Sequence, residues 1–146
     1  MSPFRLTFDL LNGHSNTINV LAFSSCGSYL ASSREDKLLI IWRVSDSMLL
    51  YVPAFESPIT ALVWHPNAPA ILFCGCKNGA VLWLKNFSEV GVRPDLSILF
   101  GVQGQVHCID YDSHLRCLAM GMGQLILVSA ETPTGVCTSL ALMTII

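Results

Sequence analysis

Charged residues are scarce in this chain of 146 residues. Only 12% of them are Asp, Glu, Lys or Arg, about half the share of an average domain. The eight lysines and arginines are scattered, and the formal net charge is -2. Nucleic-acid binding needs a concentrated basic surface, so we expect no nucleic-acid partner. Because the chain is 52% hydrophobic, it should bury much of its length or present apolar surface to a partner.

Long apolar runs are also missing. Every run is broken by Gly, Ser, Pro or Lys before it is long enough to cross a membrane. The N-terminus lacks the basic segment followed by an apolar core that marks a signal peptide. We therefore expect an intracellular protein, cytoplasmic or nuclear, with no membrane partner. In such a compartment the six cysteines should be free thiols rather than a disulfide framework.

The motifs of common catalytic and cofactor sites are absent too. The glycines at 101, 104, 121 and 123 are not followed by the Lys and Ser/Thr of a phosphate-binding loop. Ser24–Gly27 is not followed by a helical pattern, which a nucleophile elbow requires. We predict no catalytic residues, no metal and no cofactor, and hence no enzyme.

The sequence does contain short β-type segments separated by polar turns. Between Gly13 and Trp42 these segments are Ile18–Phe23, Ser28–Ser33 and Leu38–Trp42. The last two are too continuously apolar for strands with one wet face, so they should be covered on both faces. No helix is expected.

A repeat follows when the chain is shifted by 41 positions. Trp83 then falls on Trp42, Trp64 on Phe23 and Ile71 on Leu30. That period is typical of a four-stranded propeller blade. A third unit aligns Val106–Tyr111 with Ile59–Trp64, although it has no tryptophan.

The first unit resembles a WD-repeat blade of a β-propeller. The resemblance rests on Gly13-His14, Leu21-Ala22-Phe23-Ser24, Gly27, Tyr29-Leu30-Ala31-Ser32, Asp36 and Ile40-Ile41-Trp42. It departs from the family at Arg43, where an aspartate is usual. The resemblance implies an all-β fold, an incomplete WD-repeat β-propeller of about three four-stranded blades.

The predicted organisation has four parts. Residues 1–12 form a ring-closing strand, 13–57 blade one, 58–101 blade two and 102–146 a degenerate blade three. Since propellers use at least four blades, we expect part of a longer propeller, self-association, or pairing with another propeller fragment. The apolar tail from Gly135 to Ile146 favours a truncated product of a longer protein.

The resemblance also implies a buried polar network that holds the first blade together. Its members are His14, Ser32, Asp36 and Trp42. In the second unit Lys77 would stand at the Asp36 position, and only Trp83 of the network would survive. The alternative is that Asp36 and His14 are ordinary solvated residues of turns.

The family's docking face implies a function, that of a non-enzymatic scaffold for protein–protein interaction with partners of unknown identity. Its outward positions would be Thr17, Asn19 and Glu35 in blade one, Pro58, Thr60 and Cys76 in blade two, and Gln105, His107 and Met122 in blade three. Solvated turn residues remain the alternative explanation for this set.

Two other functions are weighed against the scaffold. Cys74, Cys76, Cys108 and Cys117, with histidines close in sequence, are candidates for a metal-binding β domain, but they lack the two-residue gap of zinc pairs. A hydrolase would use His107, Asp110 and Asp112 as an acid–base cluster, although we favour a polar turn as the explanation for them.

Overall fold

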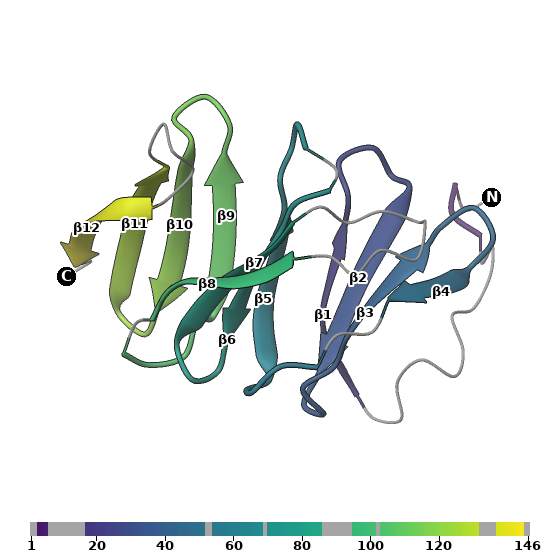
Figure 1. The fold of residues 1–146 in the computed structure, drawn as a ribbon, viewed down its shortest axis with the longest axis horizontal. Helices are drawn as coiled ribbons and strands as arrows, with labels where there is room; N and C mark the ends of the chain where they lie inside the picture. Colours follow the sequence, from purple (N-terminus) through teal and green to yellow (C-terminus); the bar gives the residue numbers. More distant parts are fainter. Residues whose placement is uncertain are drawn as a thin grey trace.

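The computed structural model describes residues 3–5, 17–51, 54–68, 70–85, 95–101, 103–131 and 137–144. This part of the chain forms twelve strands and no helix. The strands make three four-stranded antiparallel sheets, which stand side by side in chain order (Figure 1). The predicted fold class is confirmed. The predicted ring-closing strand and His14 lie outside the described residues, apart from residues 3–5, which form no strand.

Each sheet is a meander in which every strand pairs with the next strand of the chain. We call the three sheets blade one, blade two and blade three; the blade boundaries expected from the sequence stay predictions. Blade one consists of β1 (Ile18–Phe23), β2 (Tyr29–Arg34), β3 (Leu39–Arg43) and β4 (Met48–Tyr51). Blade two consists of β5 (Ile59–Trp64), β6 (Leu72–Cys76), β7 (Ala80–Lys85) and β8 (Asp95–Gly101). Blade three consists of β9 (Cys108–Asp112), β10 (Cys117–Met122), β11 (Leu125–Glu131) and β12 (Cys137–Thr144).

Local chemistry explains the tight turns between these strands. In blade one the backbone N–H of Gly27 donates to the carbonyl of Ser24 at 2.9 Å, and the Ser24 hydroxyl accepts from the N–H of Tyr29 at 3.0 Å. Gly27 has a φ of 74°, a left-handed conformation that only glycine adopts without strain. The polar segments therefore end each strand and reverse the chain.

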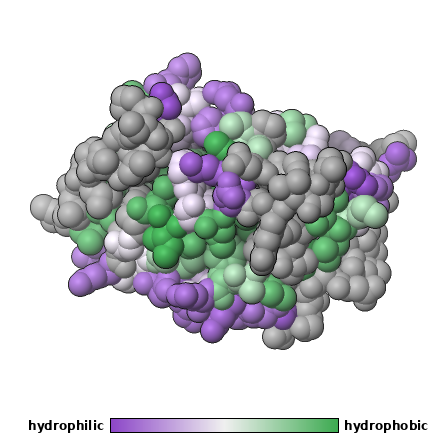
Figure 2. All heavy atoms as spheres, viewed as in Figure 1, coloured by the Kyte–Doolittle hydropathy of each residue, from purple (hydrophilic) through white to green (hydrophobic). Residues whose placement is uncertain are grey.

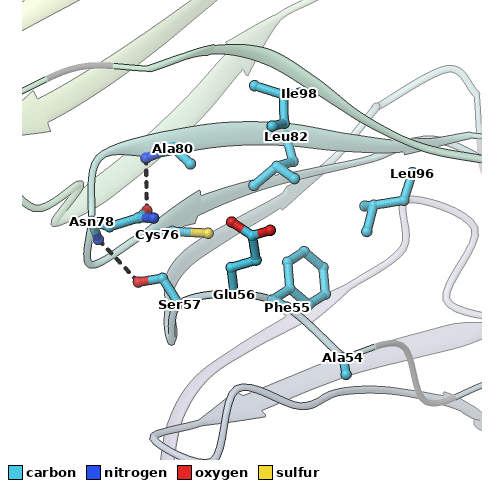
Figure 3. Close-up of a pocket in the computed structure, with 10 residues that line it drawn as sticks. All are labelled: Ala54, Phe55, Glu56, Ser57, Cys76, Asn78, Ala80, Leu82, Leu96 and Ile98. Carbon is cyan, nitrogen blue, oxygen red and sulfur yellow. Dashed lines mark hydrogen bonds between the residues drawn. The ribbon is translucent and has the colours of Figure 1, made fainter.

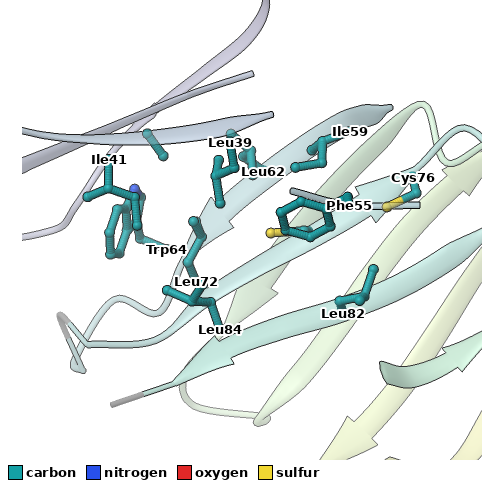
Figure 4. Close-up of a cluster of buried hydrophobic side chains, with 12 residues drawn as sticks. Leu39, Ile41, Phe55, Ile59, Leu62, Trp64, Leu72, Cys76, Leu82 and Leu84 are labelled. Carbon is teal, nitrogen blue, oxygen red and sulfur yellow. The ribbon is translucent and has the colours of Figure 1, made fainter. Parts of the chain in front are cut away.

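Two apolar cores lie between the blades. The first joins blades one and two and includes Leu39, Ile41, Ile59, Trp64, Leu72 and Leu84 (Figure 4). The second joins blades two and three and includes Phe73, Val81, Val106, Tyr111, Leu118 and Met120. Blade two is thus covered on both faces by its neighbours. In blade one, for which the sequence predicted strands covered on both faces, Leu39–Trp42 are also buried. Figure 2 shows apolar residues across the middle of the molecule, with hydrophilic residues along its lower edge.

The innermost strands β1, β5 and β9 are neighbours in space (Figure 1). The indole N–H of Trp64 on β5 donates to the backbone carbonyl of Ala22 on β1 at 2.9 Å. Trp64 also stacks on Tyr29 of blade one, with ring centroids 6.2 Å apart. Trp64 therefore fixes blade two against blade one by packing and by a hydrogen bond together.

The repeat period differs from the 41 residues expected. It holds for the inner strands, where Trp64 occupies the place of Phe23, but not for the strands that follow. Phe23 pairs with Leu30 in blade one, whereas Trp64 pairs with Leu72 in blade two. The segment between the paired residues is therefore one residue longer in blade two. From there the offset is 42, since Leu84 pairs with Leu72 as Trp42 pairs with Leu30.

The extra residue turns the second tryptophan to the other face of its blade. The prediction that Trp83 takes the place of Trp42 is wrong, because a shift of one residue in a strand reverses the direction of each side chain. Trp83 stacks on Phe73, with centroids 6.2 Å apart, and Phe73 stacks on Tyr111 of blade three at 5.2 Å. Trp83 belongs to the packing between blades two and three, not to a copy of the network.

Gly75 on β6 marks the closest approach between blades two and three. A Cβ built on Gly75 would overlap the side chain of Val106, which is fully buried. Gly101, at the end of β8, has open space around the same position. Of these two positions, only Gly75 must be a glycine for the blades to pack as they do.

We expect Gly75→Ala to lower the free energy of unfolding by about 1–3 kcal/mol, because the added methyl overpacks the core. The matched change Gly101→Ala should alter it by less than about 0.5 kcal/mol. Urea denaturation followed by tryptophan fluorescence measures both. Equal effects of the two substitutions would contradict the close contact between the blades.

Candidate protein-interaction surface

The predicted network of blade one is present in part. The indole N–H of Trp42 on β3 donates to the hydroxyl of Ser32 on β2 at 2.8 Å. Both side chains are buried, so the bond satisfies a donor that would otherwise be costly to remove from water. His14, the third member, lies outside the described residues.

Asp36 has partners in the turn between β2 and β3. Its Oδ1 accepts the N–H of Leu38 at 3.2 Å, and its Oδ2 pairs with Nη2 of Arg34. Arg34 is buried, and its Nε and Nη1 have no hydrogen-bond partner among the described residues. Sequence reasoning missed Arg34; its place two residues before Asp36, at the end of a strand, was the available signal.

The same turn in blade two uses a different residue from the one predicted. Asn78, not Lys77, stands at the Asp36 position, and its Oδ1 accepts the N–H of Ala80 at 3.0 Å. The longer segment before β6 again accounts for the shift. Cys74 and Leu84 fill the places of Ser32 and Trp42, so packing replaces the tryptophan–serine hydrogen bond in blade two.

A double-mutant cycle tests the bond in blade one. Trp42→Phe and Ser32→Ala should each destabilise the protein, with a coupling of about 0.5–1.5 kcal/mol in the double variant because they share one hydrogen bond. Chemical denaturation gives the free energies of unfolding. As a control, Trp83→Phe combined with Ser32→Ala should be additive within about 0.5 kcal/mol. Additivity of the Trp42 pair would show that the bond contributes nothing.

Polar side chains of adjacent blades meet on one face, at the turns that enter the inner strands and join the second and third strands. Asn19 donates from Nδ2 to Oε1 of Glu35 at 3.2 Å. Lys77 Nζ lies 3.6 Å from Oε2 of Glu35. The side chains of Glu35 and Lys77 are 57% and 55% exposed, so the pair spans the boundary between two blades while remaining open to solvent. Blade three adds Gln105 and His107, whose side-chain nitrogens are 3.5 Å apart.

We call this set the turn face: Thr17, Asn19, Glu35, Lys77, Gln105 and His107. The structure joins Asn19, Glu35 and Lys77 by side-chain contacts and places Gln105 beside His107, while Thr17 is exposed just before β1. Lys77 was not in the predicted set, because the expected period placed Cys76 at this position. Two other members of the predicted set, Pro58 and Thr60, are half-buried. The Thr60 hydroxyl lies within hydrogen-bonding reach of the carbonyls of Gly75 and Val106, so Thr60 joins blades two and three.

Two of the positions expected to face outward are buried instead. Cys76 and Met122 end the second strands of their blades and take the place of the buried Arg34. The exposed position is one residue further on, at Lys77 and Gly123. For Cys76 the error follows from the same one-residue shift. That shift does not account for Met122, because Tyr111 pairs with Leu118 at the same spacing as Phe23 with Leu30.

Neither rival function finds a site in the part of the chain that the structure describes. No group of three or more His, Cys, Asp or Glu side chains there lies close enough together to hold a metal ion. Asp112 caps a turn by accepting from the N–H of His114 at 2.8 Å, and Asp110 accepts from the N–H of Tyr111 at 2.9 Å. His107 lies beyond the opposite end of β9 from Asp112, so the three do not converge.

The cysteines differ sharply in their chemistry. Burial raises the pKa of the Cys76 thiol to about 11 and that of Cys74 well above its usual range. Cys26 is exposed, and hydrogen bonds from Ser24 and Ser28 lower its pKa to about 7. Since the thiolate is the reactive form, Cys26 should react well before the buried pair.

Iodoacetamide alkylation followed by peptide mass spectrometry checks this difference. The rate at Cys26 should rise with pH around a midpoint of about 7 and stay far above the rates at Cys74 and Cys76. Ser24→Ala removes the strongest stabiliser of the thiolate and should move the midpoint upward. Ser25→Ala is the control and should leave it unchanged. If Ser24→Ala leaves the midpoint unchanged, the hydrogen bond from Ser24 is not the cause of the lowered pKa of Cys26.

The chain matches known proteins over parts of its length. Residues 5–43 match the family "WD domain, G-beta repeat". A "WD repeat-containing protein 26 homolog" of Arabidopsis thaliana is 32% identical over 81 residues, which are 53% of this chain and 14% of that protein. The "Target of rapamycin complex subunit wat1" of Schizosaccharomyces pombe is 30% identical over 78 residues, 53% of this chain and 24% of that protein.

Solved structures share the fold over most of the chain. The structures "Structure of U3-55K" and "Crystal structure of RRP9 WD40 repeats" each align with a TM-score of 0.75 at 24% identity. Each alignment covers 91% of this chain and 38% of the other. The chain therefore has the fold of part of a WD40 propeller and spans well under half of these proteins. In the described residues no helix is long and apolar enough to cross a membrane.

Proposed function

We propose that this chain, which consists of three blades of a WD-repeat β-propeller, is a non-enzymatic scaffold that binds protein partners through its turn face. The observation that carries the proposal is the exposed chain of contacts from Asn19 through Glu35 to Lys77, which crosses from blade one to blade two. Three side chains held in register across two sheets offer a partner a fixed pattern of charges and hydrogen-bonding groups. Complementary charges and hydrogen-bonding groups of this kind give a partner specificity.

The cellular context of relatives agrees with this proposal. One relative is described as a subunit of a target of rapamycin complex, and another, from Mus musculus, as a ribosome biogenesis protein. We infer that this chain likewise works inside the cell, in the cytoplasm or nucleus, as part of an assembly. The low content of basic residues supports a protein partner over nucleic acid.

The outer face of blade one supports the view that further blades complete the propeller. Leu21 and Phe23 are 60% and 64% exposed on the face of β1 opposite Val20 and Ala22, which pack toward blade two. On blade three, Asp110 is exposed on the corresponding open face. In a ring of two copies Phe23 would meet Asp110, and burying an unpaired carboxylate there is costly. Pairing with blades of different sequence is therefore favoured over closure by a second copy.

The turn face is tested by exchanging its charges without changing the net charge. Glu35→Lys with Lys77→Glu keeps an ion pair but reverses its pattern, and should remove most of the partners captured from cell extract by the unaltered chain. Quantitative mass spectrometry of the captured proteins measures the loss. The matched control is Arg43→Asp with Asp46→Arg, which exchanges the charges of a pair between the last residue of β3 and the turn that follows it. If both exchanges leave the same partners bound, the turn face is not the binding surface.

A further inference from the structure

A pocket of about 300 Å³ lies beside the outermost strand of blade two. Ala54 and Phe55, from the segment between β4 and β5, border it on one side, while Leu82, Leu96 and Ile98 border it from β7 and β8 (Figure 3). Ile98 is 69% exposed and Leu96 is 38% exposed. Large aliphatic side chains therefore remain in contact with water at a concave site, which favours the burial of an apolar group there.

One negative charge belongs to this apolar pocket. Figure 3 shows the Glu56 carboxylate directed into it, between Phe55 and Cys76. Glu56 pairs with no cation among the described residues. An apolar pocket with one unpaired carboxylate is complementary to a ligand that has an apolar group next to a positive charge.

Hydrogen-bond donors lie at one end of the pocket. The Ser57 oxygen accepts from the N–H of Asn78 at 3.1 Å, which leaves its hydroxyl hydrogen to donate. The Asn78 oxygen accepts from the N–H of Ala80, which leaves its NH₂ group to donate. These two donors suit the carbonyl groups of a peptide backbone, whereas a purely apolar ligand would leave them unused.

We propose that this pocket binds an extended peptide segment of a partner, with one large apolar side chain in the pocket and a Lys or Arg two positions along it paired with Glu56. Side chains two positions apart point to the same side of an extended chain, so both reach the pocket. The volume lies at the small end of ligand sites and suits a side-chain anchor rather than a folded domain. No residue that lines the pocket belongs to the turn face, although Cys76 and Asn78 flank Lys77 in sequence. The two sites are therefore tested by different substitutions.

Fluorescence polarisation with a designed peptide tests the proposal. The probe is a fluorescein-labelled octapeptide of Gly and Ser that contains one Leu and, two positions later, one Lys. The full chain is used below the concentration at which light scattering detects association. Replacing the Leu of the probe by Ser should weaken binding about tenfold or more. Replacing its Lys by Glu should weaken binding about fivefold.

Binding measurements on variants of the protein show where the peptide binds. Ile98→Ser should weaken binding about fivefold or more, whereas Leu115→Ser, which changes an equally exposed residue (72%) in blade three, should not. Glu56→Lys should reverse the preference, so that the Glu peptide binds better than the Lys peptide. Glu35→Lys should leave that preference unchanged. Circular dichroism confirms that each variant keeps its strands.

Several results would overturn the peptide site. The first is that the parent probe does not bind, and the second is that the three peptides bind equally well. The third is that neither Ile98→Ser nor Glu56→Lys changes the binding. A loss of binding caused by Glu35→Lys alone would move the peptide to the turn face. Concentration-dependent dimers that Ile98→Ser abolishes would show that a second copy fills the pocket instead. The proposal that the turn face binds partners is tested separately, by the charge exchange Glu35→Lys with Lys77→Glu.

Discussion

The mutual covering of apolar sheet faces is the constraint on which this structure depends. Blade two has apolar side chains on both faces, with Leu72 and Leu84 toward blade one and Phe73 and Val81 toward blade three. A four-stranded sheet of this kind cannot be stable alone in water, because both faces would be wet. Each blade therefore depends for its stability on the apolar face of a neighbouring blade. Trp64 shows how, since it fills the first core and also donates a hydrogen bond to blade one.

This constraint explains where binding groups are found. The faces of the blades are used for packing, so polar side chains with freedom to contact a partner remain at the turns and along the outer strands. Glu35 and Lys77 occupy equivalent turns of successive blades, and the close packing of those blades brings their charged ends together. The pocket beside β8 lies where residues 54–57, which connect blade one to blade two, meet β6, β7 and β8.

The two open ends of the arc differ in chemistry. The face of blade one that no described blade covers exposes Leu21 and Phe23, whereas that of blade three exposes Asp110. A symmetric assembly would need each end to fit the other. The carboxylate of Asp110, which lies on the same face as Ala119 and Val128, distinguishes the open face of blade three from that of blade one.

The sequence by itself determined the strands, the number of blades and the first hydrogen-bonded pair, Trp42 with Ser32, because alternation, turn residues and the motif around Trp42 are local signals. It also placed Asn19 at the start of an inner strand and Glu35 in the turn after the second strand, where the structure has them. Only the tertiary structure decided which face Trp83 occupies and that Lys77 rather than Cys76 is exposed. One additional residue before β6 causes both, and strand register is set by pairing across the sheet, not by spacing along the chain. The contact of Glu35 with Lys77 likewise depends on residues distant in sequence, and no local pattern contains it.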